Sequence, residues 1–223
     1  MKTLFLDASA SYGAVGLMLD GKVIFNKNTG PARTHSETLL PIAAEALGED
    51  GMMGVGLIAC SVGPGSFTGV RIAVSLAKGL AAPRDIPCVG LSSLEVLAYP
   101  YADFDGTVCA MLDARRGNVY NALFEGGKRT RPDRLISLEE LAVELRATEK
   151  PVMLTGDAAL DAAGLFDKEK VHIGAGVPDG GAGAALGELI FNNVKKDYSA
   201  RLLRPEYLRP SQAERERESK ENG

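Results

Sequence analysis

LIACSVGPGSFTGVRIAVSLAKGL, at residues 57–80, is the stretch that decides how this chain folds. Its first part, Leu57 to Val62, is a short apolar run that predicts a buried strand. Turn-forming residues follow, and helical periodicity then begins at Phe67 and continues to Leu80. A glycine turn between a strand and a helix can hold an anion on the free amides of the helix N-terminus. The candidates for binding an anion or nucleotide here are Gly63, Gly65 and Ser66.

The turn matches neither of the common nucleotide-binding motifs. A Walker loop needs lysine after its last glycine, but Val70 follows Gly69 and the first lysine is Lys78. The dinucleotide fingerprint needs a third glycine at the position of Thr68. Ser66 and Thr68 can therefore either donate to an anion or cap the helix, and the residues favour capping.

The helix predicted from Phe67 is apolar on almost every side. Its polar residues Arg71, Ser75 and Lys78 form one narrow stripe. A helix this apolar is buried on more than one side, whereas a sheet covers only one face. We therefore predict that it is an interface element, with Val70, Ala73, Val74 and Ala77 at the contact.

Composition describes an ordinary globular chain. Its 223 residues can form one large or two modest domains. A net charge of −4 from mixed acidic and basic residues disfavours nucleic-acid binding by this chain alone. Cys60, Cys88 and Cys109 lie in apolar contexts without Cys-x-x-Cys spacing, which predicts buried, reduced thiols and a cytoplasmic protein. We expect neither a signal peptide nor a membrane span.

A hairpin pattern occurs twice. Leu6-Asp7-Ala8 matches Leu112-Asp113-Ala114, and Asp20-Gly21 matches Glu125-Gly126. The repeat predicts a duplicated α/β fold with a first lobe at 1–103, a second lobe at 104–200 and a partly disordered C-terminal segment at 201–223. The matches are short and gapped, so a chance similarity remains the alternative.

Helix signals occur in both halves. Thr34 and Glu37 form a capping box for a helix ending near Leu47, and Ser137 and Glu140 form a second box. Further helices are predicted at 93–97 and 184–193, the latter after a loose glycine-rich stretch at 174–183. The chain's two histidines, at 35 and 172, are predicted to pack rather than to catalyse.

Several motifs together resemble the TsaB family, also called YeaZ. They are Leu6-Asp-Ala-Ser9, Thr34-His-Ser-Glu-Thr-Leu-Leu-Pro41, Gly63-Pro-Gly-Ser-Phe-Thr-Gly-Val-Arg71, Leu112-Asp-Ala-Arg-Arg-Gly117, Thr155-Gly-Asp157 and Tyr207-Leu-Arg209. The resemblance covers nearly the whole chain. It implies an actin-like (ASKHA, RNase H-like) α/β fold with two similar lobes, each with a mixed central sheet flanked by helices. It also implies a part in making threonylcarbamoyladenosine next to the anticodon of tRNAs that read ANN codons in bacteria.

The resemblance implies a non-catalytic scaffold that is a paralogue of the transferase TsaD. TsaD-like proteins carry Asn-His-Leu-Glu-x-His, with two metal-binding histidines, where this chain has Ser92-Ser-Leu-Glu-Val-Leu97. Ser93 and Leu97 replace both ligands, so we expect no catalytic residue and no metal site. We expect no cofactor on this chain, whereas the assembled complex uses ATP and magnesium.

The same resemblance indicates where an actin-like ATPase would bind nucleotide. The positions to test are Asp7, Ser9, Asp113 and Asp157, together with the glycine turn. The first loop lacks a compact glycine turn, and Arg115-Arg116 is bulky in the second, so we expect weak or no ATP binding. The alternative is that these aspartates accept local backbone N–H groups.

The family also implies partners. TsaD is expected to dock on helices 36–47 and 67–80, TsaE to join that pair, and tRNA to be reached only through the complex. In isolation the exposed aliphatic surface predicts a homodimer. Two other functions stay open: an independent actin-fold small-molecule kinase or ATPase, and a glycoprotease-like peptidase. The predicted contact residues are Leu39, Leu40, Ala43, Leu47, Val70, Ala73, Val74 and Ala77.

Overall fold

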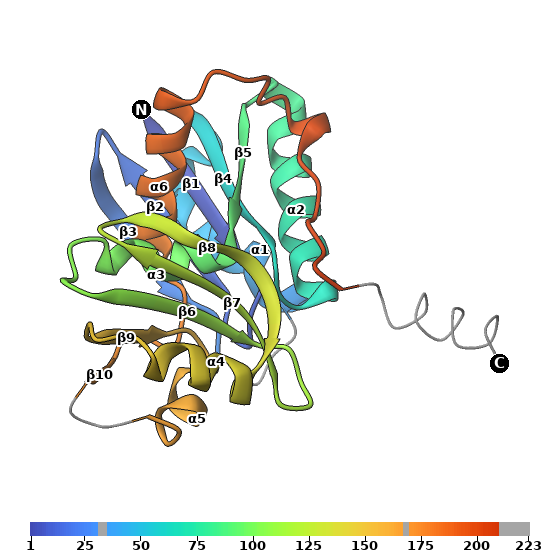
Figure 1. Ribbon diagram of the computed structural model, residues 1–223. Coiled ribbons are helices and arrows are strands. Elements are labelled where there is room, and N and C mark those ends of the chain that lie inside the picture. Colours follow the sequence, from blue (N-terminus) through green and yellow to red (C-terminus); the bar gives the residue numbers. More distant parts are fainter. Residues whose placement is uncertain (31–34, 167–169, 210–223) are drawn as a thin grey trace, which may run out of the picture.

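The structure is a computed structural model that describes residues 1–30, 35–166 and 170–209, and it contains two five-stranded sheets (Figure 1). The first sheet has the order β3-β2-β1-β4-β5, and the second has the order β10-β9-β6-β7-β8. The strands of the first sheet are β1 (Lys2–Asp7), β2 (Ala14–Leu19), β3 (Lys22–Asn28), β4 (Val55–Gly63) and β5 (Cys88–Ser92). Those of the second are β6 (Thr107–Asp113), β7 (Asn118–Glu125), β8 (Lys128–Ser137), β9 (Val152–Thr155) and β10 (Val171–Ile173).

The two sheets have the same topology, which confirms the predicted duplication. β1 pairs antiparallel with β2 and parallel with β4, and β6 pairs in the same way with β7 and β9. Asp7 faces Ala14 at the end of the first hairpin, and Asp113 faces Val119 at the end of the second. Each lobe therefore places an aspartate at the same corner of its sheet.

The helices cover the sheets and join them. They are α1 (His35–Leu47), α2 (Phe67–Ala81), α3 (Ser93–Ala98), α4 (Leu138–Arg146), α5 (Ala159–Ala163) and α6 (Gly180–Asn193), with short 3₁₀ turns at 48–50, 82–84, 99–101 and 200–202. α1 and α2 share an apolar core with the first sheet, and α4 and α5 share another with the second. α3 packs between the sheets, where Leu94 and Leu97 contact the β6 residues Val108 and Leu112 in one buried cluster.

α6 lies in the segment 104–200 that was predicted to form the second lobe. Although it follows the second-lobe strands in sequence, it packs against β1, β2 and β4 of the first lobe (Figure 1). Asp179 caps it by accepting a hydrogen bond from the Ala182 amide at 2.6 Å, so the helix begins at Gly180 rather than at Ala184. Its glycines are buried because they let the helix approach the sheet closely. A Cβ on Gly183 would come within 2.5 Å of the Phe5 ring.

Residues 203–209, which we call the strap, return along α2 (Figure 1). The Glu206 amide donates to the Val62 carbonyl at 2.7 Å, and the Tyr207 ring stacks on Phe67 with centroids 4.4 Å apart. The chain itself thus covers one flank of α2. The predicted disordered tail at 210–223 lies outside the described residues. No helix within the described ranges is long and apolar enough to cross a membrane.

Candidate partner-binding groove and lobe junction

The glycine turn after β4 is packed against the rest of the chain. The Ser66 side chain caps α2 by accepting a hydrogen bond from the Gly69 amide at 3.2 Å, as the favoured interpretation predicted. The Ser66 amide donates to the Ser9 carbonyl at 2.6 Å. A Cβ on Gly65 would collide with that carbonyl, and a Cβ on Gly63 would collide with the Glu206 carbonyl. The glycines therefore serve close packing, and anion binding at this turn stays a prediction.

Asp7 is a fully buried carboxylate. Its Oδ1 accepts hydrogen bonds from the Ser9 amide at 2.8 Å and the Ser9 hydroxyl at 3.0 Å. Burial raises the pKa of Asp7, and the hydrogen bonds from the Ser9 amide and hydroxyl oppose that rise. A carboxylate enclosed in this way offers no oxygen to solvent, which matches the alternative that it accepts local donors.

Asp157 joins the two lobes. Its Oδ1 accepts from the Asp113 amide at 2.9 Å, and its Oδ2 accepts from the Ser11 hydroxyl at 3.2 Å. Asp113 in turn accepts from the Arg115 amide at 2.7 Å. The structure thus brings Asp113 and Asp157 together, in contacts that fix the loops. Within the described residues, no three His, Cys, Asp or Glu side chains are grouped so as to hold a metal ion.

α3 contains Ser93 and Leu97, the two positions at which the sequence was expected to lack metal-binding histidines. Ser92 caps this helix by accepting from the Glu95 amide at 3.3 Å. Ser93 and Leu97 lie one turn apart and are both buried between the sheets. Leu97 Cδ1 lies 3.1 Å from where a Cβ on Gly156 would stand. Aliphatic packing therefore fills the space next to this helix face.

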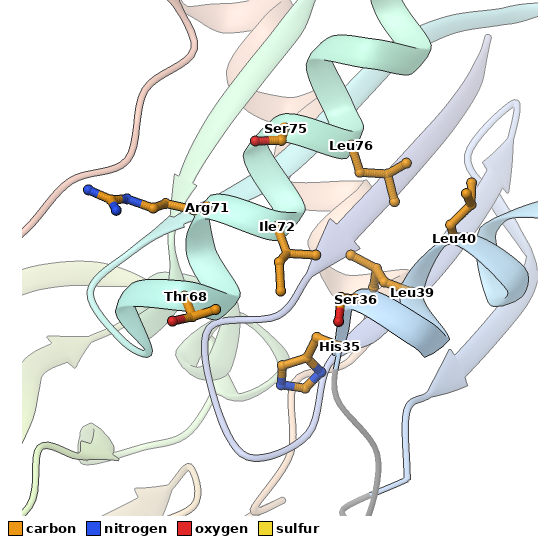
Figure 2. Close-up of a pocket in the computed structure, with 9 residues that line it drawn as sticks. All are labelled: His35, Ser36, Leu39, Leu40, Thr68, Arg71, Ile72, Ser75 and Leu76. Carbon is orange, nitrogen blue, oxygen red and sulfur yellow. The ribbon is translucent and has the colours of Figure 1, made fainter.

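An open groove of about 480 Å³ lies between α1 and α2 (Figure 2). Leu40 is 52% exposed on its α1 side, and Ile72 and Leu76 are half-buried on its α2 side. Arg71 extends from α2 away from α1, and its Nε donates to the Tyr207 hydroxyl at 2.8 Å (Figure 2). The groove is lined by His35, Ser36, Leu39, Leu40, Thr68, Arg71, Ile72, Ser75 and Leu76.

The predicted contact residues lie mostly in the core of the first lobe, and their contact with a partner stays a prediction. Only Leu40 of the eight is exposed, because the others face the first sheet and belong to its core. Periodicity identified the apolar stripe of each helix, and that stripe packs inside the chain. Ile72 and Leu76 line the groove but were not among the predicted contact residues, because they lie on the flank between the core stripe and the polar stripe. The seven buried residues are Leu39, Ala43, Leu47, Val70, Ala73, Val74 and Ala77.

The repeated strand order and the helix between the two sheets define a two-lobed α/β protein of the actin-like class. The family model of TsaD, tRNA N6-adenosine threonylcarbamoyltransferase, matches residues 29–151. The tRNA threonylcarbamoyladenosine biosynthesis protein TsaB of Bacillus subtilis (strain 168) is 34% identical over 224 residues, covering 96% of each chain. TsaB of Escherichia coli (strain K12) is 35% identical over 129 residues, which is 56% of this chain and 55% of that protein. This chain therefore belongs to the TsaB family.

Solved structures agree with this assignment. YeaZ from Pseudomonas aeruginosa superimposes with a TM-score of 0.78 at 25% identity, over 93% of this chain and 99% of that one. A second structure, an uncharacterized protein with similarity to peptidase YEAZ from Pseudomonas aeruginosa, gives 0.79 at 26% identity with the same coverage.

Proposed function

We propose that this chain is a non-catalytic subunit that binds TsaD and supports the formation of threonylcarbamoyladenosine on tRNA. TsaE joins the pair, and the assembled complex uses ATP and magnesium. The observation that carries the proposal is the open groove between α1 and α2, in a chain of the TsaB family.

The groove has the chemistry of a docking surface. Its centre is aliphatic, with Leu40, Ile72 and Leu76, and its rim carries polar side chains such as Ser75 and Arg71. An apolar centre inside a polar rim is typical of protein interfaces. The groove is also braced on both sides, because α1 and α2 rest on the sheet and the strap holds Arg71. A rigid surface of this kind loses little conformational entropy when a partner binds.

The non-catalytic part of the proposal is supported at the lobe junction. Ser93 and Leu97 leave α3 without the paired imidazoles that would hold a metal. Asp7 is buried, and Asp157 is engaged with both lobes. These aspartates bind loop residues of the chain itself. This arrangement favours a scaffold over an enzyme that transfers phosphoryl groups.

The test is pairing with TsaD from the same organism, followed by light scattering during size exclusion and by titration. Leu40→Glu and Ile72→Glu should each weaken pairing about 30-fold or more, because a charge would enter the desolvated centre of the interface. Circular dichroism and the melting temperature should stay as in the unmodified chain. Val143→Glu is the matched control, since Val143 is exposed on α4 of the other lobe. A charge at Val70 or Ala73 would instead test folding, because both residues are buried.

The same samples with ATP and magnesium test the kinase-like alternative. Groove variants that pair with TsaD as tightly as the unmodified chain would place the interface elsewhere. A chain that ignores TsaD and binds ATP with saturation would overturn the scaffold role.

A further inference from the structure

The turn between β6 and β7 has an unusual backbone. Arg115, Arg116 and Gly117 are consecutive and have φ angles of +68°, +57° and +73°. Residues with a side chain rarely adopt this left-handed region, which glycine occupies freely. Two arginines where glycine would fit better are a backbone outlier that points to a function for their side chains.

The turn is held firmly on both sides. The Arg115 amide donates to Asp113 Oδ1 at 2.7 Å, and Asn118 Nδ2 donates to the Arg116 carbonyl at 3.1 Å. The Gly117 carbonyl accepts from the Leu138 amide, at the start of α4, at 2.9 Å. In Figure 1 the turn projects beyond the end of the second sheet. It is a fixed support for two projecting guanidinium groups.

Positive charge collects at this turn. The Arg115 side chain is 82% exposed, and its ion pair with Asp113, at 3.0 Å, is exposed too and therefore weak. Arg116 is exposed and has no side-chain partner among the residues that the structure describes. Arg209 of the strap brings a third guanidinium, donating to the Ala114 carbonyl at 3.2 Å. By contrast, Arg134 on β8 is neutralised by Glu144 at 2.6 Å.

We propose that the 115–117 turn and Arg209 contact the phosphodiester backbone of the tRNA held by the complex, an inference that rests on the proposed function. Guanidinium groups bind phosphate oxygens through paired hydrogen bonds. Exposure as high as that of Arg115 suits an extended polyanion better than a small enclosed phosphate. The chain's net charge of −4 explains why the contact needs tRNA already bound by a partner.

The strap connects this turn to the proposed docking groove. Tyr207 binds Arg71, which lines the groove, and Arg209 binds the base of the turn two residues later. A partner seated in the groove would therefore lie beside the turn. RNA bound to that partner could cross onto Arg115 and Arg116 without any movement of the lobes.

The test measures tRNA binding by the TsaD pair over a series of salt concentrations, with the double variant Arg115→Gly, Arg116→Gly. We expect affinity to fall about tenfold at roughly 0.1 M salt and the salt slope to shrink by about 1 to 2. The melting temperature should hold or rise, because glycine accepts the left-handed backbone. Arg115→Lys, Arg116→Lys should keep most of the slope, and Arg84→Ala, at an exposed arginine of the 82–84 turn, should match the unmodified pair.

Three results would overturn the contact. One is unaltered tRNA affinity and slope in a double glycine variant that still pairs with TsaD. Another is a lowered melting temperature in that variant, which would give the arginines a structural role. The third is a double glycine variant that loses binding of ATP or pyrophosphate but binds tRNA as before. That result would mean that the turn binds the phosphates of a nucleotide. Failure of the unmodified chain to pair with TsaD would overturn the proposed function and this contact together.

Discussion

At the scale of single residues, the buried carboxylate of Asp7 makes stability depend on pH. Burial raises its pKa from the ordinary value of 3.8, so folding favours the protonated form. The stability that Asp7 contributes is therefore present in full below about pH 3.8 and is lost as the pH rises through the folded-state pKa. We expect Asp7→Asn to gain stability relative to the unmodified chain between pH 4 and pH 7. The side-chain oxygen of the asparagine can still accept the hydrogen bond from the backbone amide of Ser9.

Urea denaturation of both proteins at the two pH values measures this difference, and the comparison cancels every titrating group that the two chains share. A stability difference that stays constant would show that folding leaves the pKa of Asp7 unchanged. A difference that shifts toward the unmodified chain as the pH rises would show that the ionised carboxylate is the stabilised form. In the second case, the hydrogen bonds from Ser9 would outweigh burial.

The burial and redox state of a residue could be predicted where they depend only on its neighbours in the sequence. The three cysteines are buried and free, as their apolar neighbours predicted, and burial raises the pKa of Cys88 to about 11 and of Cys109 to about 12. The roles of the aspartates were left open, because a turn carboxylate looks the same whether it faces solvent or the core. In the structure Asp7 is fully buried, and the Ser9 loop beside it packs closely against Gly65.

At the scale of the elements, α6 shows how glycine allows a helix to lie on a sheet. Gly183→Ala would bring a methyl group to within 2.5 Å of the Phe5 ring, which is fully buried and has little room to move. We expect a loss of about 1–3 kcal/mol in the free energy of unfolding. Gly79→Ala in α2 is the matched control, because no atom lies within 4 Å of its added methyl group. It should gain about 0.5–1 kcal/mol from helix propensity.

Chemical denaturation of the two glycine variants gives both values. Equal effects from the two substitutions would mean that α6 can shift outward by the width of a methyl group. The close contact with Phe5 would then contribute nothing specific to the placement of the helix.

Elements were predictable where sequence carries a periodic signal or a cap. The helix expected from Phe67 to Leu80 is α2, Phe67–Ala81, and the Ser137–Glu140 capping box is present at the start of α4. β8 was missed because it is a charged edge strand with Pro132 inside it, so it lacks apolar alternation. The apolar stripes of α1 and α2 were predicted to face a partner and instead pack in the core of the first lobe, because periodicity alone does not tell a core-facing stripe from a partner-facing one.

At the scale of the whole molecule, the strap determines which surface stays open. It covers one flank of α2 through Tyr207, which stacks on Phe67, and the Glu206 amide ties it to Val62 of β4. α1 borders the other flank of α2. The sheet covers the inner face of α2, so the groove is where this helix still presents aliphatic side chains, Ile72 and Leu76, to solvent. Sequence could not show this, because the strap is more than 120 residues away from α2 along the chain.

An open aliphatic groove should also lead the isolated chain to pair with itself. We expect light scattering to give about twice the chain mass of 23.5 kDa at high concentration, with the Leu40→Glu variant monomeric. Because one groove holds one partner at a time, added TsaD should replace the homodimer with a one-to-one pair. If the Leu40→Glu variant stays dimeric, self-association uses a different face. The same conclusion follows if the TsaD complex retains two copies of this chain in contact with each other. The groove would then be free for TsaD at every concentration, and homodimer formation could not compete with assembly.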